Sequence, residues 1–349
     1  MDPRKNNFDF LRIVFATFVI ITHSYPLTGM AECDWLCQLT NDQLSFSYVG
    51  VKGFFIISGY LIFQSMERSR GIVDYYWKRL LRLFPALFVV LLLTVLLAPF
   101  VYESSLPYLK NISVWTYLPN NLTLFKIQYN IQGVFEHNPF KGAVNGSLWT
   151  IPYEFTMYVF LSLFIFLRKN KTLTRVFLAM CFTGWVIAHV FFLEAAARYT
   201  FFINGKFLVD LGVFFMAGAL LSALRIEKLK YQNLLFLISL ALLILSLACN
   251  VFTYAKFITL PLAVILFGLQ STPVLRELGS KVGDLSYGVY IYAFPVQQTL
   301  VYYFAPNYWQ LMLISIPITY ILAYVSWHCI EKQALTLKNI HPATRKIKG

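Results

Sequence analysis

The chain has 349 residues, of which 58% are hydrophobic and only 13% are charged, and its mean hydropathy is +0.62. A soluble globular domain typically carries about 25% charged residues, so this composition excludes a soluble domain and favours an integral membrane protein. The net charge of +13 would favour nucleic-acid binding in a soluble protein, but in a hydrophobic chain topology must be considered first.

Apolar segments long enough to cross a bilayer recur along the whole chain. A membrane-spanning helix needs about 20 residues, with a range of roughly 17–25. The predicted spans are 8–27, 45–65, 83–101, 147–167, 173–193, 207–224, 233–252, 255–270, 284–304 and 309–330. We therefore expect an all-α integral membrane protein with about ten transmembrane helices, formed by a single domain over residues 1–349.

The distribution of Lys and Arg predicts that both termini lie in the cytoplasm. With the N-terminus inside, the cytoplasmic segments include the basic stretches 66–82 and 168–175 and a short basic tail at 332–349. The outer segments carry scattered cations, at Lys110, Lys126, Lys141, Arg198, Lys206 and Lys256. Positive loops stay inside, so the excess charge is mostly topological and we expect no nucleic-acid partner. The tail is expected to contact anionic membrane lipids.

Cysteine spacing predicts no metal site. Cys33 and Cys37 fall in the first outer loop, where their spacing is equally compatible with a disulfide and with two unpaired small residues. The other cysteines, Cys181, Cys249 and Cys329, lie in apolar spans and are interpreted as packing residues.

The first span carries two side chains that are costly in a membrane. Arg12 and His23 are eleven residues apart, which brings both to one helix face at an axial separation of about 16 Å. A charge inside a span costs roughly 2.5–3.5 kcal/mol on insertion scales and indicates a function. The alternative is that Arg12 extends inward and pairs with Asp9, while His23 is satisfied at the interface.

The next two spans begin with further basic residues. Gly50, Gly53 and Gly59 of the second span permit close helix approach, and we expect Lys52 to extend outward towards the membrane surface. Before the third span, Lys78, Arg79 and Arg82 lie three and four residues apart and form one basic patch. The patch indicates either simple anchoring on the inner side or a binding site for a phosphorylated ligand.

The fourth span carries a carboxylate, Glu154, about two turns from its start. A carboxylate facing lipid is strongly disfavoured, so we expect Glu154 to face the bundle interior. It could act as a general base or orient a histidine, or serve as a structural partner for Lys52 or His23. Trp149 and Tyr153, four residues apart, share a similar helix face.

These segments together resemble the acyltransferase-3 family of bacterial membrane acyltransferases. The resemblance rests on five features in order: Arg12 with His23, Phe54 to Tyr60, Arg79 to Pro85, Ser147 to Glu154, and Leu285 to Tyr290 with Pro295. Each motif alone is weak, but together they run from residue 8 to about 331. Two features depart from the family, because Ala293 stands where many members have histidine and no proline follows soon after Glu331.

The resemblance implies transfer of an acyl group, usually acetyl, from cytoplasmic acyl-CoA to a sugar hydroxyl of a surface or exported glycan. It places the protein in the bacterial inner membrane, with acetyl-CoA as donor substrate and no tightly bound cofactor or metal. Self-association into a homo-oligomer is compatible with the sequence. We expect the candidate residues to act as follows: His23 as general base, Glu154 in orienting it or holding the acceptor, Arg12, Lys78, Arg79 and Arg82 in binding the donor, and Trp149 and Tyr153 in binding the acceptor.

The rival prediction is a proton-coupled transporter or flippase for a glycan or lipid-linked intermediate. Intramembrane Arg, His and Glu also suit proton-coupled transport. Against it, the sequence shows no inverted repeat of the kind that many transporters carry. A receptor or scaffold has no specific feature in its favour. An acyltransferase would consume acyl-CoA and release the CoA thiol, whereas a transporter would not.

Overall fold

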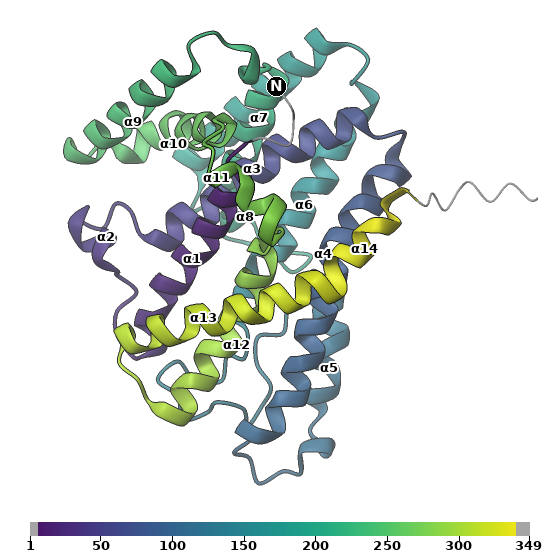
Figure 1. Cartoon of the computed structure of the whole chain (residues 1–349), viewed down its shortest axis with the longest axis vertical. Coiled ribbons are helices and arrows are strands. Elements are labelled where there is room, and N and C mark those ends of the chain that lie inside the picture. The colour runs from purple at the N-terminus through teal and green to yellow at the C-terminus, as the bar shows by residue number, and fades with distance from the viewer. Residues whose placement is uncertain (1–5, 340–349) are drawn as a thin grey trace, which may run out of the picture.

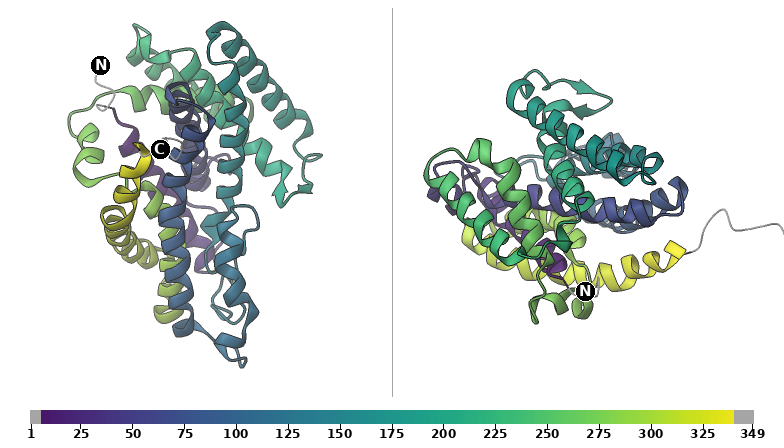
Figure 2. Two further views of the ribbon diagram at one scale, coloured as in Figure 1. Left: turned by 90° about the vertical axis from the view of Figure 1, so that its right-hand side faces the viewer. Right: turned by 90° about the horizontal axis from the view of Figure 1, so that it is seen from above.

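The computed structural model describes residues 6–339, without the side chains of 278–281 and 339, and is mostly helical (Figure 1). Within these residues the one sheet is a hairpin of two short antiparallel strands, β1 (Tyr199–Thr200) and β2 (Ile203–Asn204). The hairpin lies at the edge of the molecule in the right-hand view of Figure 2. The last ten residues of the predicted basic tail lie outside the described residues.

The helical elements follow one another along the chain with short connections. The longer ones are α1 (Phe8–Leu27), α3 (Phe46–Arg68), α4 (Ile72–Leu97), α5 (Ile112–Leu122), α6 (Ile151–Ser162), α7 (Lys171–Phe192), α8 (Gly205–Ala223), α9 (Gln232–Ala248), α10 (Phe252–Leu269), α12 (Ser286–Phe304) and α13 (Tyr308–Ser326). The shorter ones are α2 (Trp35–Leu39), α11 (Leu275–Val282) and α14 (Lys332–Thr336). Short 3-10 turns are η1 (Ala98–Val101), η2 (Tyr108–Lys110), η3 (Gly146–Thr150), η4 (Leu163–Phe166), η5 (Ile226–Lys228) and η7 (Leu337–Asn339), and η6 (Trp327–Glu331) is a π-helical turn.

Eight helical segments of the described chain are long and apolar enough to cross a membrane. They are Phe8–Leu27, Phe46–Arg68, Ile72–Val101, Gly146–Phe166, Lys171–Phe192, Gly205–Ala223, Phe252–Leu269 and Tyr308–Thr336. Each overlaps one of the predicted spans. The two remaining predicted spans correspond to α9, a shorter apolar helix, and to α12. The prediction of an all-α membrane protein is thereby confirmed.

Helix α9 shows how the outer surface suits lipid. Its buried residues are two serines, Ser239 and Ser246, while leucines such as Leu237 and Leu242 are exposed. Both serine hydroxyls donate to carbonyl oxygens of their own helix, at 2.8 and 2.7 Å. Apolar residues outside and satisfied small polar residues inside are typical of a helix that faces lipid.

Helices α3 and α8 cross in close contact at the centre of the bundle. A Cβ added at Gly59 would lie 1.9 Å from the carbonyl oxygen of Phe215, and one at Gly218 would lie 2.0 Å from that of Ile56. Two glycines, one on each helix, therefore allow the backbones to meet. This confirms that glycine in the second span permits close helix approach.

The bundle has two chemically different ends. We call the end that carries Arg68, Lys78, Arg168 and Arg225 the basic face. There Arg168 donates to backbone carbonyls at the end of α3, and Arg225 binds Glu67 at 2.6 Å. We call the opposite end, which carries residues 28–45 and 102–145, the loop face. There α5 packs alongside α4, as Figures 1 and 2 show. Cys33 and Cys37, also on this face, are joined by a disulfide.

Candidate functional site

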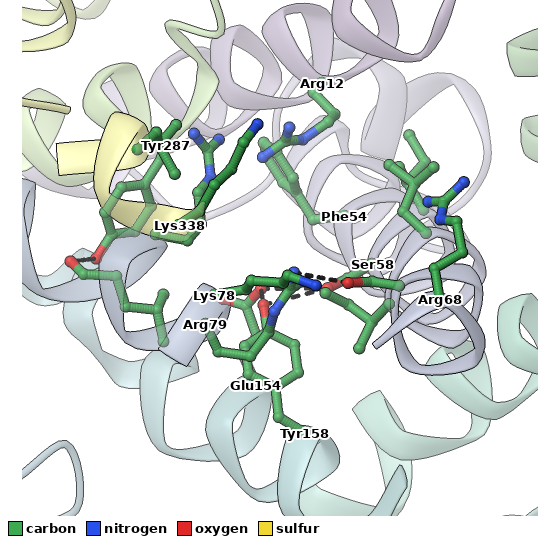
Figure 3. Close-up of a pocket in the computed structure, with 17 residues that line it drawn as sticks. Arg12, Phe54, Ser58, Arg68, Lys78, Arg79, Glu154, Tyr158, Tyr287 and Lys338 are labelled. Atoms are coloured by element: carbon green, nitrogen blue, oxygen red, sulfur yellow. Dashed lines mark hydrogen bonds between the residues drawn. The ribbon is translucent and has the colours of Figure 1, made fainter. Parts of the chain in front are cut away.

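A cavity of about 520 Å³ near the basic face is lined by six cations (Figure 3). We call it the basic cavity. Its cations are Arg12, Arg68, Lys78, Arg79, Arg82 and Lys338, and its lining includes one carboxylate, Glu154. Figure 3 shows Arg12, Arg68 and Lys338 on different sides of this space. The structure therefore brings the predicted basic patch together with Arg12, on α1, in one cavity suited to an anionic ligand.

Arg79 differs from the other residues of the predicted basic patch. Its guanidinium donates to Ser65 Oγ at 3.1 Å and faces the rings of Tyr75 and Tyr158 at 6.0 and 5.9 Å. Its Nε is buried without a partner, and no carboxylate of the described residues lies within ion-pair distance of it. Lys78, in contrast, binds Asp74 at 2.7 Å. A poorly paired, partly buried cation is costly, so Arg79 is poised to bind an anion.

Two other arginines of the cavity share one carboxylate. Arg12 and Arg82 both donate to Asp284 Oδ2, Arg82 at 2.5 Å, and Ser286 donates to Oδ1 at 2.6 Å. A carboxylate that accepts from two guanidinium groups is held in its ionised form. The ionised Asp284 thus fixes a guanidinium from α1 beside one from α4. The alternative partner considered for Arg12, Asp9, is not the one it binds.

Glu154 faces the bundle interior, as predicted. Its Oε1 accepts hydrogen bonds from Tyr158 OH and, at 3.2 Å, from Ser58 Oγ. Besides the basic cavity, Glu154 lines a second cavity of about 60 Å³, which we call the middle cavity. There the rings of Phe54 and Tyr290 meet edge to face with centroids 5.9 Å apart.

His23 lines a third cavity, of about 200 Å³, towards the loop face, which we call the histidine cavity. Its Nδ1 is buried and has no hydrogen-bond partner among the described residues, and its ring meets the edge of Phe294 at 5.6 Å. Glu154 does not line this cavity, and no hydrogen bond joins it to His23 in the described chain. The expectation that Glu154 orients His23 therefore finds no contact to support it.

The three cavities follow one another across the bundle. The basic and middle cavities share five lining residues: Arg12, Phe54, Ser58, Glu154 and Tyr287. The middle and histidine cavities share Val51 and Tyr290. Arg12 and His23, which the helical period placed on one face of α1, thus line the same series of cavities.

Trp149 and Tyr153 come together as predicted, with ring centroids 5.9 Å apart. Both line a fourth cavity, of about 370 Å³, near the loop face, where most of the lining residues are aromatic. We call it the aromatic cavity. Trp149 also lines the histidine cavity, so the two cavities adjoin at this side chain.

The prediction that Lys52 extends outward is wrong. Its side chain is 5% exposed and binds Asp210 of α8, whose other oxygen lies 3.1 Å from His189 Nε2. Because a carboxylate is available inside the bundle, the ammonium group need not reach the surface. Asp210 lies within the predicted span 207–224, and a charge there is itself a detectable signal.

Two further residues were not singled out from the sequence, although Asp284 lies at the start of the predicted span 284–304. Asp284 is 272 positions from Arg12, and its role as a shared partner depends on the packing of α1 against the segment before α12. Glu32 lines the histidine cavity because of the path that the loop after α1 takes. Neither contact follows from helical periodicity.

Comparison with known proteins identifies relatives of the whole chain. A family model described as an acyltransferase domain (acyltransferase-3) matches residues 5–328. The chain is 30% identical to the O-acetyl transferase of Shigella phage Sf6, covering 95% of this chain and 97% of that protein. It is also 30% identical to Nodulation protein 10 of Rhizobium leguminosarum bv. viciae, covering 98% and 96% of the two. No solved structure matches the chain.

Proposed function

Since the chain belongs to the acyltransferase-3 family and is an O-acyltransferase, we propose that it moves an acetyl group from cytoplasmic acetyl-CoA to a sugar hydroxyl of a cell-surface or exported glycan. The observation that carries this proposal is the series of three cavities between the poorly paired Arg79 and a His23 nitrogen that has no partner in the described part of the chain. The name of the phage relative supports acetyl as the group transferred.

The proposal places the basic face in the cytoplasm of a bacterial cell, because positively charged segments stay on that side of the inner membrane. Acetyl-CoA then enters the basic cavity, where its phosphates meet Arg79, with Arg12 and Arg82 held nearby by Asp284. The long pantetheine arm extends past Glu154 through the middle cavity and carries the thioester towards His23.

At the histidine cavity the imidazole of His23 acts as general base. It takes the proton of the acceptor hydroxyl as the hydroxyl oxygen attacks the thioester carbonyl carbon. A carbon–oxygen bond forms and the carbon–sulfur bond breaks, and the CoA sulfur takes the proton back from the imidazolium. A neutral imidazole suits this exchange near neutral pH. The products are an acetylated glycan and the CoA thiol, and this reaction needs no metal and no bound cofactor.

The test is CoA thiol release by the purified protein. It is supplied with acetyl-labelled acetyl-CoA and with polysaccharide from bacterial cells that lack the gene for this protein. We expect His23→Ala to lower the rate at least about 100-fold, since general acid–base catalysis contributes roughly 10²–10⁴. His137→Ala is the matched control, because its side chain is 82% exposed and lines none of the four cavities. Equal rates in the wild type and His23→Ala would refute the assigned base.

A series of cavities between two faces would also serve a proton-coupled transporter or flippase. The same assay separates the two functions, because a transporter leaves the thioester of acetyl-CoA intact. Thiol release by the wild type without any labelled glycan would indicate hydrolysis and would contradict the proposed acceptor.

A further inference from the structure

The aromatic cavity takes no part in the donor route. Seven of its ten lining residues are aromatic, one is a cation, Lys126, and none is a carboxylate. It is built by four separate segments: residues 125–129, the start of the fourth predicted span, the β1–β2 hairpin and the start of α8. We propose that this cavity binds the acceptor sugar by the apolar C–H face of its ring, an inference that rests on the proposed function.

The wall of the cavity is formed by a cluster of three rings. The centroids of Trp149 and Phe207 are 5.2 Å apart, those of Trp149 and Tyr153 are 5.9 Å apart, and those of Tyr153 and Phe207 are 6.1 Å apart. All three pairs meet edge to face rather than stacked. The face of an aromatic ring is slightly negative, whereas the C–H groups on the apolar face of a sugar are slightly positive. Such rings therefore attract a pyranose face.

Polar donors at the same cavity distinguish a sugar from a lipid chain. The hydroxyls of Tyr129 and Tyr199 and the indole Nε1 of Trp149 take no hydrogen-bond partner within residues 6–339. Burial, with Tyr153 and Tyr199 nearby, raises the pKa of Tyr129 to about 12, so its hydroxyl keeps its proton and donates. A sugar satisfies these groups with its hydroxyls, whereas an acyl chain would leave them unpaired. Lys126 allows the sugar to be neutral or acidic.

The position of the cavity fits an acceptor. Its volume of about 370 Å³ falls within the range of roughly 300–1,000 Å³ typical of small-molecule sites. It shares Trp149 with the histidine cavity, so a sugar held here directs a hydroxyl past Trp149 towards His23. It also lies near the loop face, which in the proposed orientation is the side where exported glycans are found.

The test compares two neighbouring phenylalanines of the hairpin. Phe202 lines the aromatic cavity, whereas Phe201 is 88% exposed and does not. Saturation-transfer NMR is recorded on the protein in lipid nanodiscs with methyl β-D-glucopyranoside and methyl β-D-galactopyranoside as probes. We expect saturation on the C–H protons of one ring face in the wild type. Phe202→Ala should reduce this transfer at least threefold, and Phe201→Ala should leave it unchanged.

Two results would overturn the inference. An equal fall in both variants would mean that the aromatic residues only anchor the hairpin in the membrane interface. Absence of transfer to any ring proton in the wild type would mean that the cavity does not bind sugars.

Tyr199→Phe, which keeps the ring and removes only the hydroxyl, is the variant that preserves packing, and it should lower the transfer less than Phe202→Ala does.

The acceptor reaction gives a second readout. For Phe202→Ala we expect the KM for the polysaccharide to rise several-fold while the KM for acetyl-CoA stays constant; a rise in the donor KM instead would indicate a general structural defect. Failure here is distinguishable from failure of the proposed function. If the glycosides bind in the cavity but the polysaccharide is never acetylated, the sugar site is supported and the proposed reaction is refuted.

Discussion

At the scale of single residues, the chemistry depends on two polar groups that the protein leaves poorly satisfied. Arg79 lines the basic cavity without a carboxylate partner, and His23 presents a buried nitrogen without a hydrogen bond, in both cases within the described residues. Buried polar groups are normally paired, so each exception calls for an explanation. Substrate groups would satisfy both: a phosphate at Arg79, and an acceptor hydroxyl at His23.

For Arg79→Ala we predict an increase of at least tenfold in the Kd for acetyl-CoA. A hydrogen bond to a charged group contributes about 1.5–3 kcal/mol, which corresponds to roughly 10–150-fold in affinity. The measurement is isothermal titration of acetyl-CoA into the detergent-solubilised protein. Arg70→Ala is the control, because Arg70 is an exposed cation that lines none of the cavities. Equal losses in the two variants would mean that only the overall charge of the basic face matters.

The sequence predicted the residues of this site better than their partners. Helical periodicity correctly placed Arg12 and His23 along one series of cavities, because eleven residues make almost three full turns. It could not reveal that Arg12 binds Asp284 or that Lys52 binds Asp210, since these carboxylates lie on distant segments. Among the roles considered for Glu154 was orienting His23, but in the structure Glu154 binds the nearby Ser58 and Tyr158.

At the scale of elements, the contact between α3 and α8 fixes the walls of the cavities. Helix α3 contributes Phe54 and Ser58 to the basic and middle cavities, and its close approach to α8 depends on glycine. The ion pair of Lys52 and Asp210 joins the same two helices. Because a broken buried ion pair is strongly unfavourable, this contact also fixes the register of one helix against the other.

Gly218→Ala is predicted to destabilise the protein by about 1–3 kcal/mol, the usual cost of overpacking. The added methyl group would lie 2.0 Å from a backbone oxygen of α3, which cannot move independently of its helix. Gly184→Ala on α7 is the matched control, since a Cβ there meets nothing within 4 Å. Thermal unfolding in detergent, followed by gel filtration after heating, measures the difference. Equal midpoints for the two variants would show that α3 and α8 tolerate separation.

The sequence predicted where spans lie better than where helices end. The third span was expected at 83–101, but α4 begins at Ile72. Hydropathy left Lys78, Arg79 and Arg82 outside the third predicted span. In the structure these residues belong to the same helix and line the basic cavity. The helix therefore extends beyond the apolar segment, and this extension is what directs the basic patch into the cavity.

At the scale of the whole molecule, the arrangement separates donor from acceptor. The basic cavity lies near one end of the bundle and the aromatic cavity near the other, with the middle and histidine cavities between them. No single motif predicts this series, because each cavity is lined by segments far apart in the chain. Hydropathy and charge indicated which ends of the helices meet at each face, but only the packing shows that the cavities share residues.

The central claim is that acetyl-CoA reacts from the basic face with a glycan held at the loop face. The most direct test uses proteoliposomes with the basic face outward, an orientation checked by labelling Lys169→Cys with an impermeant maleimide. They are loaded with polysaccharide from host cells lacking the gene, and acetyl-labelled acetyl-CoA is added outside. The account predicts labelled polysaccharide inside the vesicles and CoA thiol outside. Labelled polysaccharide that forms only when donor and acceptor are on the same side would contradict it.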